Sequence, residues 1–69
     1  MKTRIKDIWN VSGYCIITPE EKKAPAYSAV VINGKKHKTV TLYDMPNSIA
    51  INGNIKDKSL IGSDIELIN

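Results

Sequence analysis

The chain has 69 residues, 42% of them hydrophobic and 25% charged, and a formal net charge of +3. This composition excludes an intrinsically disordered chain. A chain of this size buries only about 60% of its unfolded surface, which leaves little room for a deep catalytic cleft. We therefore expect a single small domain over residues 1–69 that serves as a binding module or an oligomer subunit.

The cysteine content and the apolar pattern favour a cytoplasmic protein. Cys15 is the only cysteine, so no disulfide can form within the chain, and a reducing compartment is the simplest setting. The basic start of the chain is followed by charged and polar residues instead of the apolar stretch of a signal peptide. No apolar run is long enough to span a membrane, and we expect no membrane partner.

Two strand-like segments open the chain. In the first, alternate positions place Ile5, Asp7 and Trp9 on one face and Lys6, Ile8 and Asn10 on the other, and after Val11 the pair Ser12 and Gly13 interrupts the run. Residues 14–18 are apolar and rich in β-branched side chains, which suit a pleated strand. Pro19 closes this segment because proline cannot donate a ladder hydrogen bond. A charged loop follows.

A β-hairpin centred on Asn33 and Gly34 is the clearest element. A type I′ turn needs positive φ at both central positions, which Asn and Gly tolerate best. The two-residue turn fixes the register, with Ile32 opposite Lys35 and the pairing continuing to residues 27 and 40. The side-chain period of two gives the hairpin one apolar face, which Lys36 and Lys38 extend beyond the edge of the core. That face comprises Tyr27, Ala29, Val31, Val40 and Leu42.

The C-terminal part predicts further short strands. Residues 44–47 form a turn, residues 48–51 a strand, and residues 65–68 the last strand. Five or six short strands with regular turn signals predict an all-β fold, a single small antiparallel β-barrel of about six strands, because closure removes exposed sheet edges. The residues assigned to structural turns are Gly13, Asn33, Gly34, Asn52, Gly53 and Gly62.

Three stretches share a pattern with a known family. The first, RIKDIWNVSGYCIIT (residues 4–18), has an apolar-acidic-apolar strand that reaches a glycine turn. The second, VVINGKKHKTVTLYDM (30–45), has a strand, a glycine turn and a strand rich in Thr and Val. The third, IKDKSLIGSDIELI (55–68), has an apolar residue, Gly and an acidic residue before a closing strand. Together they resemble the second domain of translational GTPases such as elongation factor Tu. The resemblance implies a Greek-key barrel that packs on neighbouring domains and touches RNA. It supports Gly13 and Gly62 as structural turns.

The chain also departs from that family. Where the family has a second Gly soon after the first turn, this chain has Tyr14 and Cys15, and Pro19 stands where a Gly usually follows the strand-ending Thr. No P-loop sequence G-x-x-x-x-G-K-[ST] occurs, so the resemblance does not imply GTP hydrolysis. It names no catalytic residue.

Candidates for chemistry are weak. Cys15 and His37 are the only nucleophile and base, and a working pair needs them within hydrogen-bond reach. A thiol inside an apolar strand is usually buried and inert. The carboxylates follow turns, where Asp commonly accepts local backbone hydrogen bonds, and no metal-ligand spacing occurs. We expect no catalytic residue, no metal and no cofactor.

Basic and aromatic side chains give the better candidate, a nucleic-acid site. Lysines bind phosphates in a salt-dependent way, and exposed aromatics stack on bases. The candidate residues are Lys35, Lys36, His37 and Lys38 at the hairpin tip, with Tyr14 and Tyr43 beside turns. We expect Trp9 and Tyr27 in the core, because a chain without Phe must use its other aromatics there.

Two functions stay open on this evidence. The first is a non-catalytic binding module that contacts RNA or a ribonucleoprotein such as the ribosome through the basic hairpin tip. The second is a protein-interaction or oligomer-forming barrel whose lysines only keep the tip solvated and discourage edge pairing. Nine lysines against one arginine favour the second, because the planar fork of Arg reads phosphates better.

Overall fold

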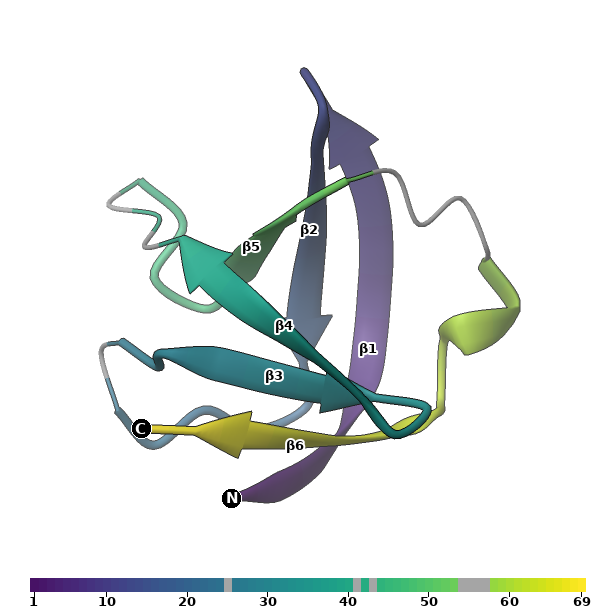
Figure 1. The fold of residues 1–69 in the computed structure, drawn as a ribbon, viewed down its shortest axis with the longest axis vertical. Coiled ribbons are helices and arrows are strands. Elements are labelled where there is room, and N and C mark those ends of the chain that lie inside the picture. The colour runs from purple at the N-terminus through teal and green to yellow at the C-terminus, as the bar shows by residue number, and fades with distance from the viewer. Residues whose placement is uncertain (25, 41, 43, 54–57) are drawn as a thin grey trace.

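Six strands close into an antiparallel β-barrel in the order β1-β2-β5-β4-β3-β6 (Figure 1). The computed structural model describes residues 1–24, 26–40, 42, 44–53 and 58–69. Within them the one helical element is a 3-10 turn, η1 (Lys58–Leu60), and no helix is long and apolar enough to cross a membrane. The prediction of an all-β barrel of about six short strands is confirmed. The strands are Lys2–Val11 (β1), Tyr14–Pro19 (β2), Ala29–Ile32 (β3), Lys35–Val40 (β4), Ile49–Asn52 (β5) and Asp64–Ile68 (β6).

Two tight turns connect neighbouring strands. Asn33 and Gly34 have φ values of 52° and 77°, and Ser12 and Gly13 between β1 and β2 have 49° and 83°. Positive φ at both positions of a two-residue loop is the type I′ geometry, whose twist matches that of the flanking strands. The predicted hairpin register is confirmed, with Ile32 opposite Lys35 and the pairing continuing to Ala29 and Lys38.

The second Asn-Gly pair does not close a hairpin. Asn52 is the last residue of β5, and both edges of β5 are already paired, with β2 on one side and β4 on the other. No further strand can add to an edge that is occupied. Gly53, with φ of 108°, turns the chain away, and its amide donates to the Gly13 carbonyl at 3.0 Å. The Gly62 amide, in the turn before β6, donates to the Ile5 carbonyl at 2.7 Å.

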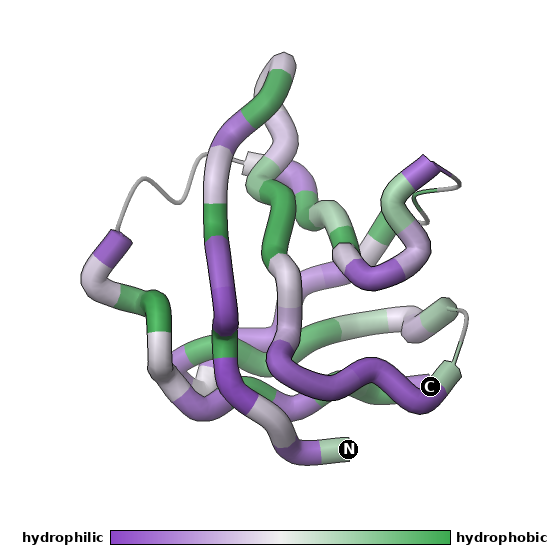
Figure 2. The backbone as a smooth tube through the Cα atoms, turned by 180° about the vertical axis from the view of Figure 1, so that it is seen from behind, coloured by the Kyte–Doolittle hydropathy of each residue, from purple (hydrophilic) through white to green (hydrophobic). Residues whose placement is uncertain are grey.

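A β-bulge in β1 sets which of its side chains enter the core. The pairing with β2 shifts between Ile5 and Asp7, so the alternation of β1 slips by one residue. Ile5 and Ile8 therefore both face inward, although strict alternation would place them on opposite sides. Figure 2 shows hydrophobic residues interspersed with hydrophilic ones along β1, and a continuous hydrophilic stretch in the loop between β2 and β3. The core cluster comprises Ile5, Ile8, Cys15, Ile17, Tyr27, Val30, Ile32, Ile49, Ile51, Leu60, Ile65 and Leu67.

The face of the β3–β4 hairpin that packs against the core is the opposite of the expected one. Val30 and Ile32 lie in the core, where they pair with Leu67 and Ile65 of β6, whereas Val31 is half-buried and Val40 is exposed. The apolar residues of the hairpin are split between both faces, so composition alone could not select one. The apolar alternation of β6 decides it, because paired residues in adjacent strands point to the same side.

Tyr27 is a core residue, as predicted, and its hydroxyl anchors the loop that precedes β3. The Tyr27 hydroxyl accepts hydrogen bonds from the amides of Lys23 at 3.1 Å and Ala24 at 3.2 Å, and donates to the Met1 sulfur at 3.4 Å. The expectation that Trp9 joins the core is wrong: it is half-buried and lies outside the core cluster.

Substitution Tyr27→Phe tests this anchor. It keeps the ring but leaves two backbone amides without their acceptor, so we expect the free energy of unfolding to fall by about 1–2 kcal/mol. Urea denaturation followed by circular dichroism measures it, with an unchanged m-value. The control is Tyr14→Phe, which removes a hydroxyl from an exposed ring. Equal losses in the two variants would contradict the role of the Tyr27 hydroxyl.

Candidate nucleic-acid interface

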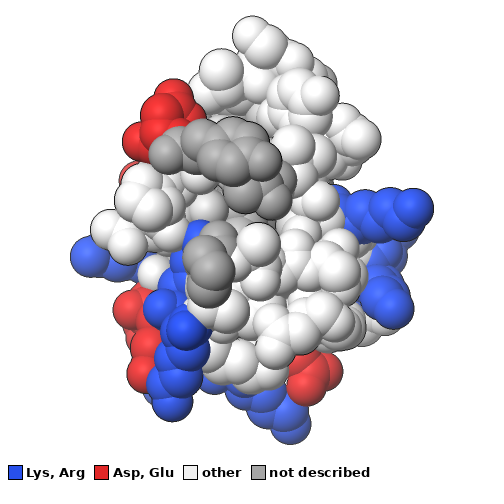
Figure 3. Space-filling view, turned by 90° about the vertical axis from the view of Figure 1, so that its left-hand side faces the viewer, with Lys and Arg blue, Asp and Glu red and all other residues white. Residues whose placement is uncertain are grey.

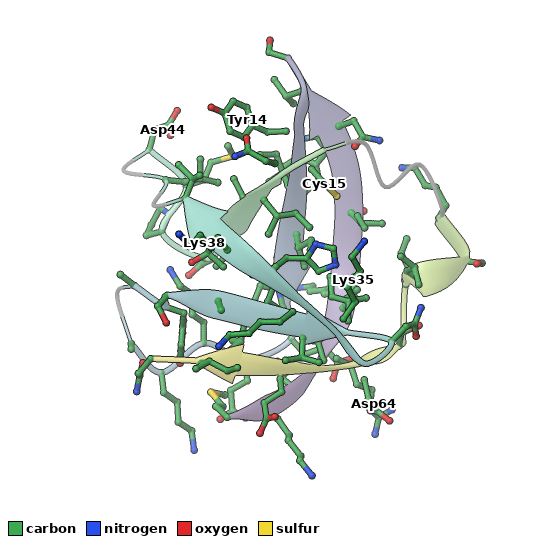
Figure 4. The ribbon with its side chains drawn as sticks, in the orientation of Figure 1. Tyr14, Cys15, Lys35, Lys38, Asp44 and Asp64 are labelled. Atoms are coloured by element: carbon green, nitrogen blue, oxygen red, sulfur yellow. The ribbon has the colours of Figure 1, made fainter. Side chains whose placement is uncertain are left out.

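The basic residues of β4 lie on two sides of the strand, as the predicted register requires. Lys36 and Lys38 share the outer side with Val40, because side chains alternate along the strand. Lys35 and His37 are opposite Ile32 and Val30, on the side that faces the interior. Lys35 is nevertheless exposed beside the turn, and His37 is half-buried. Figure 4 shows Lys35 and Lys38 towards opposite ends of β4.

Lys38 and Tyr14 lie on the outer side of strands that β5 joins. β4 pairs with β5 at Thr39 and Ile51, and Lys38 precedes Thr39 on the outer side of β4. Asn52, which follows Ile51 on β5, pairs with Tyr14 of β2. Only β5 lies between β4 and β2 in the barrel, so the backbones of Lys38 and Tyr14 are separated by roughly 10 Å or more. The fold thereby unites two predicted site residues that are distant in the sequence, and both lie on the left-hand side of the barrel in Figure 4.

Apolar side chains lie near this surface. The next outward-facing row, two residues along each strand, runs from Trp9 through Ile16 and Ala50 to Val40, and only its ends are accessible because its middle pair is buried. Among the described residues the large exposed hydrophobic side chains are Val11 (47% exposed), Tyr14 (40%), Val40 (40%) and Ile61, and the first three belong to these two rows. We call this surface the outer patch. It consists of Trp9, Val11, Tyr14, Lys38, Val40 and Asn52.

The space-filling view shows how charge is distributed around this side of the barrel. In Figure 3 uncharged atoms cover the top and right of this face, Asp and Glu atoms lie at its upper left and along its lower margins, and Lys and Arg atoms gather in separate groups at its left, right and bottom. Uncharged surface beside cations can offer stacking and phosphate contacts together, and neighbouring carboxylates weaken the phosphate contacts.

A groove beside the hairpin tip is dominated by negative charge, and its lining includes Val31, the cross-strand partner of Lys36. It has a volume of about 1040 Å³ and lies between the start of β1, the start of β6 and the Asn33-Gly34 turn. The ion pair between Arg4 Nε and Asp64 Oδ1, at 3.8 Å, joins two exposed side chains of its lining. Four carboxylates outnumber two cations there, so the groove disfavours a phosphate backbone. Its charged residues are Lys2, Arg4, Glu20, Glu21, Asp64 and Glu66.

Other predicted site residues fare differently. Tyr43 lies outside the described residues. Asn52, which the sequence assigned to a turn, and Trp9, which it assigned to the core, both contribute to the outer patch. Their place depends on β5 lying between β2 and β4. That pairing is non-local, and no signal near either residue could have revealed it.

Two of the groups considered for chemistry have structural surroundings in the described part of the chain. Cys15 is fully buried in the core, where a substrate cannot reach it. Asp7 accepts a hydrogen bond from the Ile8 amide at 2.9 Å, which is the local backbone role expected of such carboxylates. Within the described parts of the chain, no three His, Cys, Asp or Glu side chains gather where they could hold a metal ion.

Comparisons with known proteins add no relative. No protein-family model, curated protein or solved structure matches the chain. The resemblance to the second domain of translational GTPases therefore rests on the sequence stretches alone, and function has to be argued from the surface of the barrel.

The burial of Cys15 predicts a slow thiol. Reaction with a thiol reagent requires opening of the core, and a domain of this size is stabilised by about 3–5 kcal/mol. We expect labelling of the native protein to be on the order of 10² or more slower than labelling in urea. A stopped-flow assay with a chromogenic disulfide measures both rates. Native labelling as fast as in urea would contradict a buried Cys15.

Proposed function

We propose that this protein is a non-catalytic module that binds RNA, free or within a ribonucleoprotein, through β4 and the outer patch. The observation that carries the proposal is the outer side of β4, β5 and β2, where Lys38 lies two strands away from the exposed ring of Tyr14 and from Asn52, which pairs with it. Lys35 and Lys36 extend the positive charge along the same strand towards the turn.

Each part of this surface matches a chemical feature of RNA. Lysine ammonium groups neutralise phosphates and release counterions, which supplies affinity without sequence preference. An exposed tyrosine ring offers a face on which a base can stack. The acidic groove repels phosphates, which favours the part of β4 around Lys38, whose cross-strand partner Ala29 lies outside the groove lining. The resemblance to a barrel domain that touches RNA supports the same function.

A second candidate function is a protein-interaction or oligomer-forming barrel. The exposed side chains of Val11 and Val40 favour it, because apolar residues gathered on one surface often mark protein contacts. In that case the lysines of β4 only keep the hairpin solvated. The two functions differ in their response to salt, since apolar contacts do not release counterions.

Charge reversal on β4 tests the proposed function. We expect the wild-type protein to bind a mixed-sequence, unstructured RNA at low salt and to lose affinity steeply as salt rises. The triple substitution of Lys35, Lys36 and Lys38 by Glu should abolish this binding. Replacing the same lysines by Gln should leave weaker binding. The slope of log affinity against log salt concentration should then fall in magnitude by about 2, because three phosphate contacts contribute about 0.7 each. Fluorescence anisotropy with labelled RNA measures both quantities.

The matched control reverses three other exposed lysines, Lys6, Lys23 and Lys58, and so has the same net charge as the triple Glu variant. It should keep most of the wild-type affinity, and both variants should unfold in urea near the wild-type midpoint. Equal losses in the two variants would show that net charge and not β4 governs binding. Absence of RNA binding at low salt, with a stable oligomer on size exclusion, would replace the proposed function by the second.

A further inference from the structure

We propose that the RNA bound by this surface is single-stranded, with a base stacked on Tyr14 and its backbone following Lys36 and Lys38 along β4. The inference rests on the proposed function and names the class of RNA. Because bases in a duplex already stack on their neighbours, they leave no face free for a tyrosine ring, whereas unpaired bases do.

The position of Tyr14 makes its ring available to an incoming base. Tyr14 is the first residue of β2, directly after the Ser12-Gly13 turn, and its side chain is 40% exposed. Val11 pairs with it across the β1–β2 hairpin, so the ring stands beside an apolar neighbour on a rigid tight turn. Because Tyr14 stands on paired strands, few protein side chains have to become ordered when a base binds to it. The entropic cost of binding therefore stays low.

The order of the strands also sets the direction of the bound RNA. Lys36 and Lys38 line the outer side of β4, and the ring of Tyr14 lies on β2, two strands away across β5. A backbone that follows β4 would point its bases across β5 towards Tyr14. Asn52 lies between them, and its side-chain amide can both donate to and accept from a base edge.

A duplex fits this surface less well. Double-stranded RNA is recognised by its shape, through phosphates and 2′-hydroxyls along a minor groove, which needs cations spread over a wide surface. Here the cations of the interface lie along the single strand β4, and in Figure 3 the groups of Lys and Arg atoms are separated by uncharged and acidic atoms. The groove beyond the turn is acidic. The arrangement of the lysines therefore fits a single RNA strand better than an RNA duplex.

The test compares Tyr14→Ala with Tyr14→Phe on two RNA probes, an unstructured 12-nucleotide strand and the duplex with its complement. We expect the wild type to bind the single strand at least ten-fold more tightly than the duplex. Tyr14→Ala should weaken single-strand binding by roughly ten-fold to a hundred-fold, while Tyr14→Phe should bind like the wild type. The salt slope should be unchanged in both variants, because no charge is removed.

Two further measurements keep the test decisive. Tyr14→Leu retains an apolar side chain without an aromatic face, so it should fold and still lose affinity for the single strand. Trp9, the only tryptophan, lies in the neighbouring row, and its fluorescence should change when the strand binds. An unchanged affinity in Tyr14→Leu would overturn a stacking role.

The outcomes separate this inference from the proposed function. If no RNA binds at low salt, the proposed function fails and the inference fails with it. If single strand and duplex bind equally and Tyr14→Ala binds like the wild type, RNA binding stands and the inference is overturned. A third outcome uses polyglutamate as a competitor at the same concentration of charge as the RNA. If polyglutamate displaces the single-stranded RNA, and if its affinity for Tyr14→Ala is lower than its affinity for the wild type, the surface recognises acidic peptides and the inference is likewise overturned.

Discussion

The change of partner along β4 is the constraint on which the rest of this barrel depends. Its first four residues pair with β3, and its last two, Thr39 and Val40, pair with β5. This pairing joins the half of the barrel formed by β3, β6 and the start of β1 to the half formed by β5, β2 and the rest of β1. It closes the barrel around one core and makes the outer side of β4 continuous with that of β2.

The same alternation that builds the core also builds the candidate interface. Thr39 pairs with Ile51, and Ile51 with Cys15, in a row whose β5 and β2 members are core residues. One residue along each strand, the neighbouring row points outward and contains Tyr14. A slip of one residue in either pairing would exchange the two rows. Burial of the core thus fixes the register, and the register fixes the arrangement of the surface residues.

Two surfaces of opposite character meet at the β3–β4 hairpin, because Val31 lines the acidic groove and pairs with Lys36. On one side of the Asn33-Gly34 turn, carboxylates predominate in the groove formed with β1 and β6. On the other, Lys38 approaches uncharged and aromatic side chains. The formal net charge of +3 describes neither side. Where the charges lie, and not their sum, decides which kind of partner each surface attracts.

The sequence by itself determined the local features: the type I′ turn at Asn33-Gly34, the register of its hairpin and the strand character of the chain. These depend on the φ preferences and branching of a few neighbouring residues. Only the tertiary structure decided that Val30 and not Val31 faces the core, that a bulge turns both Ile5 and Ile8 inward, and that Asn52 pairs with Tyr14. Those outcomes depend on which strands meet when the barrel closes, and pairing between residues far apart in the chain leaves no mark on the residues next to them.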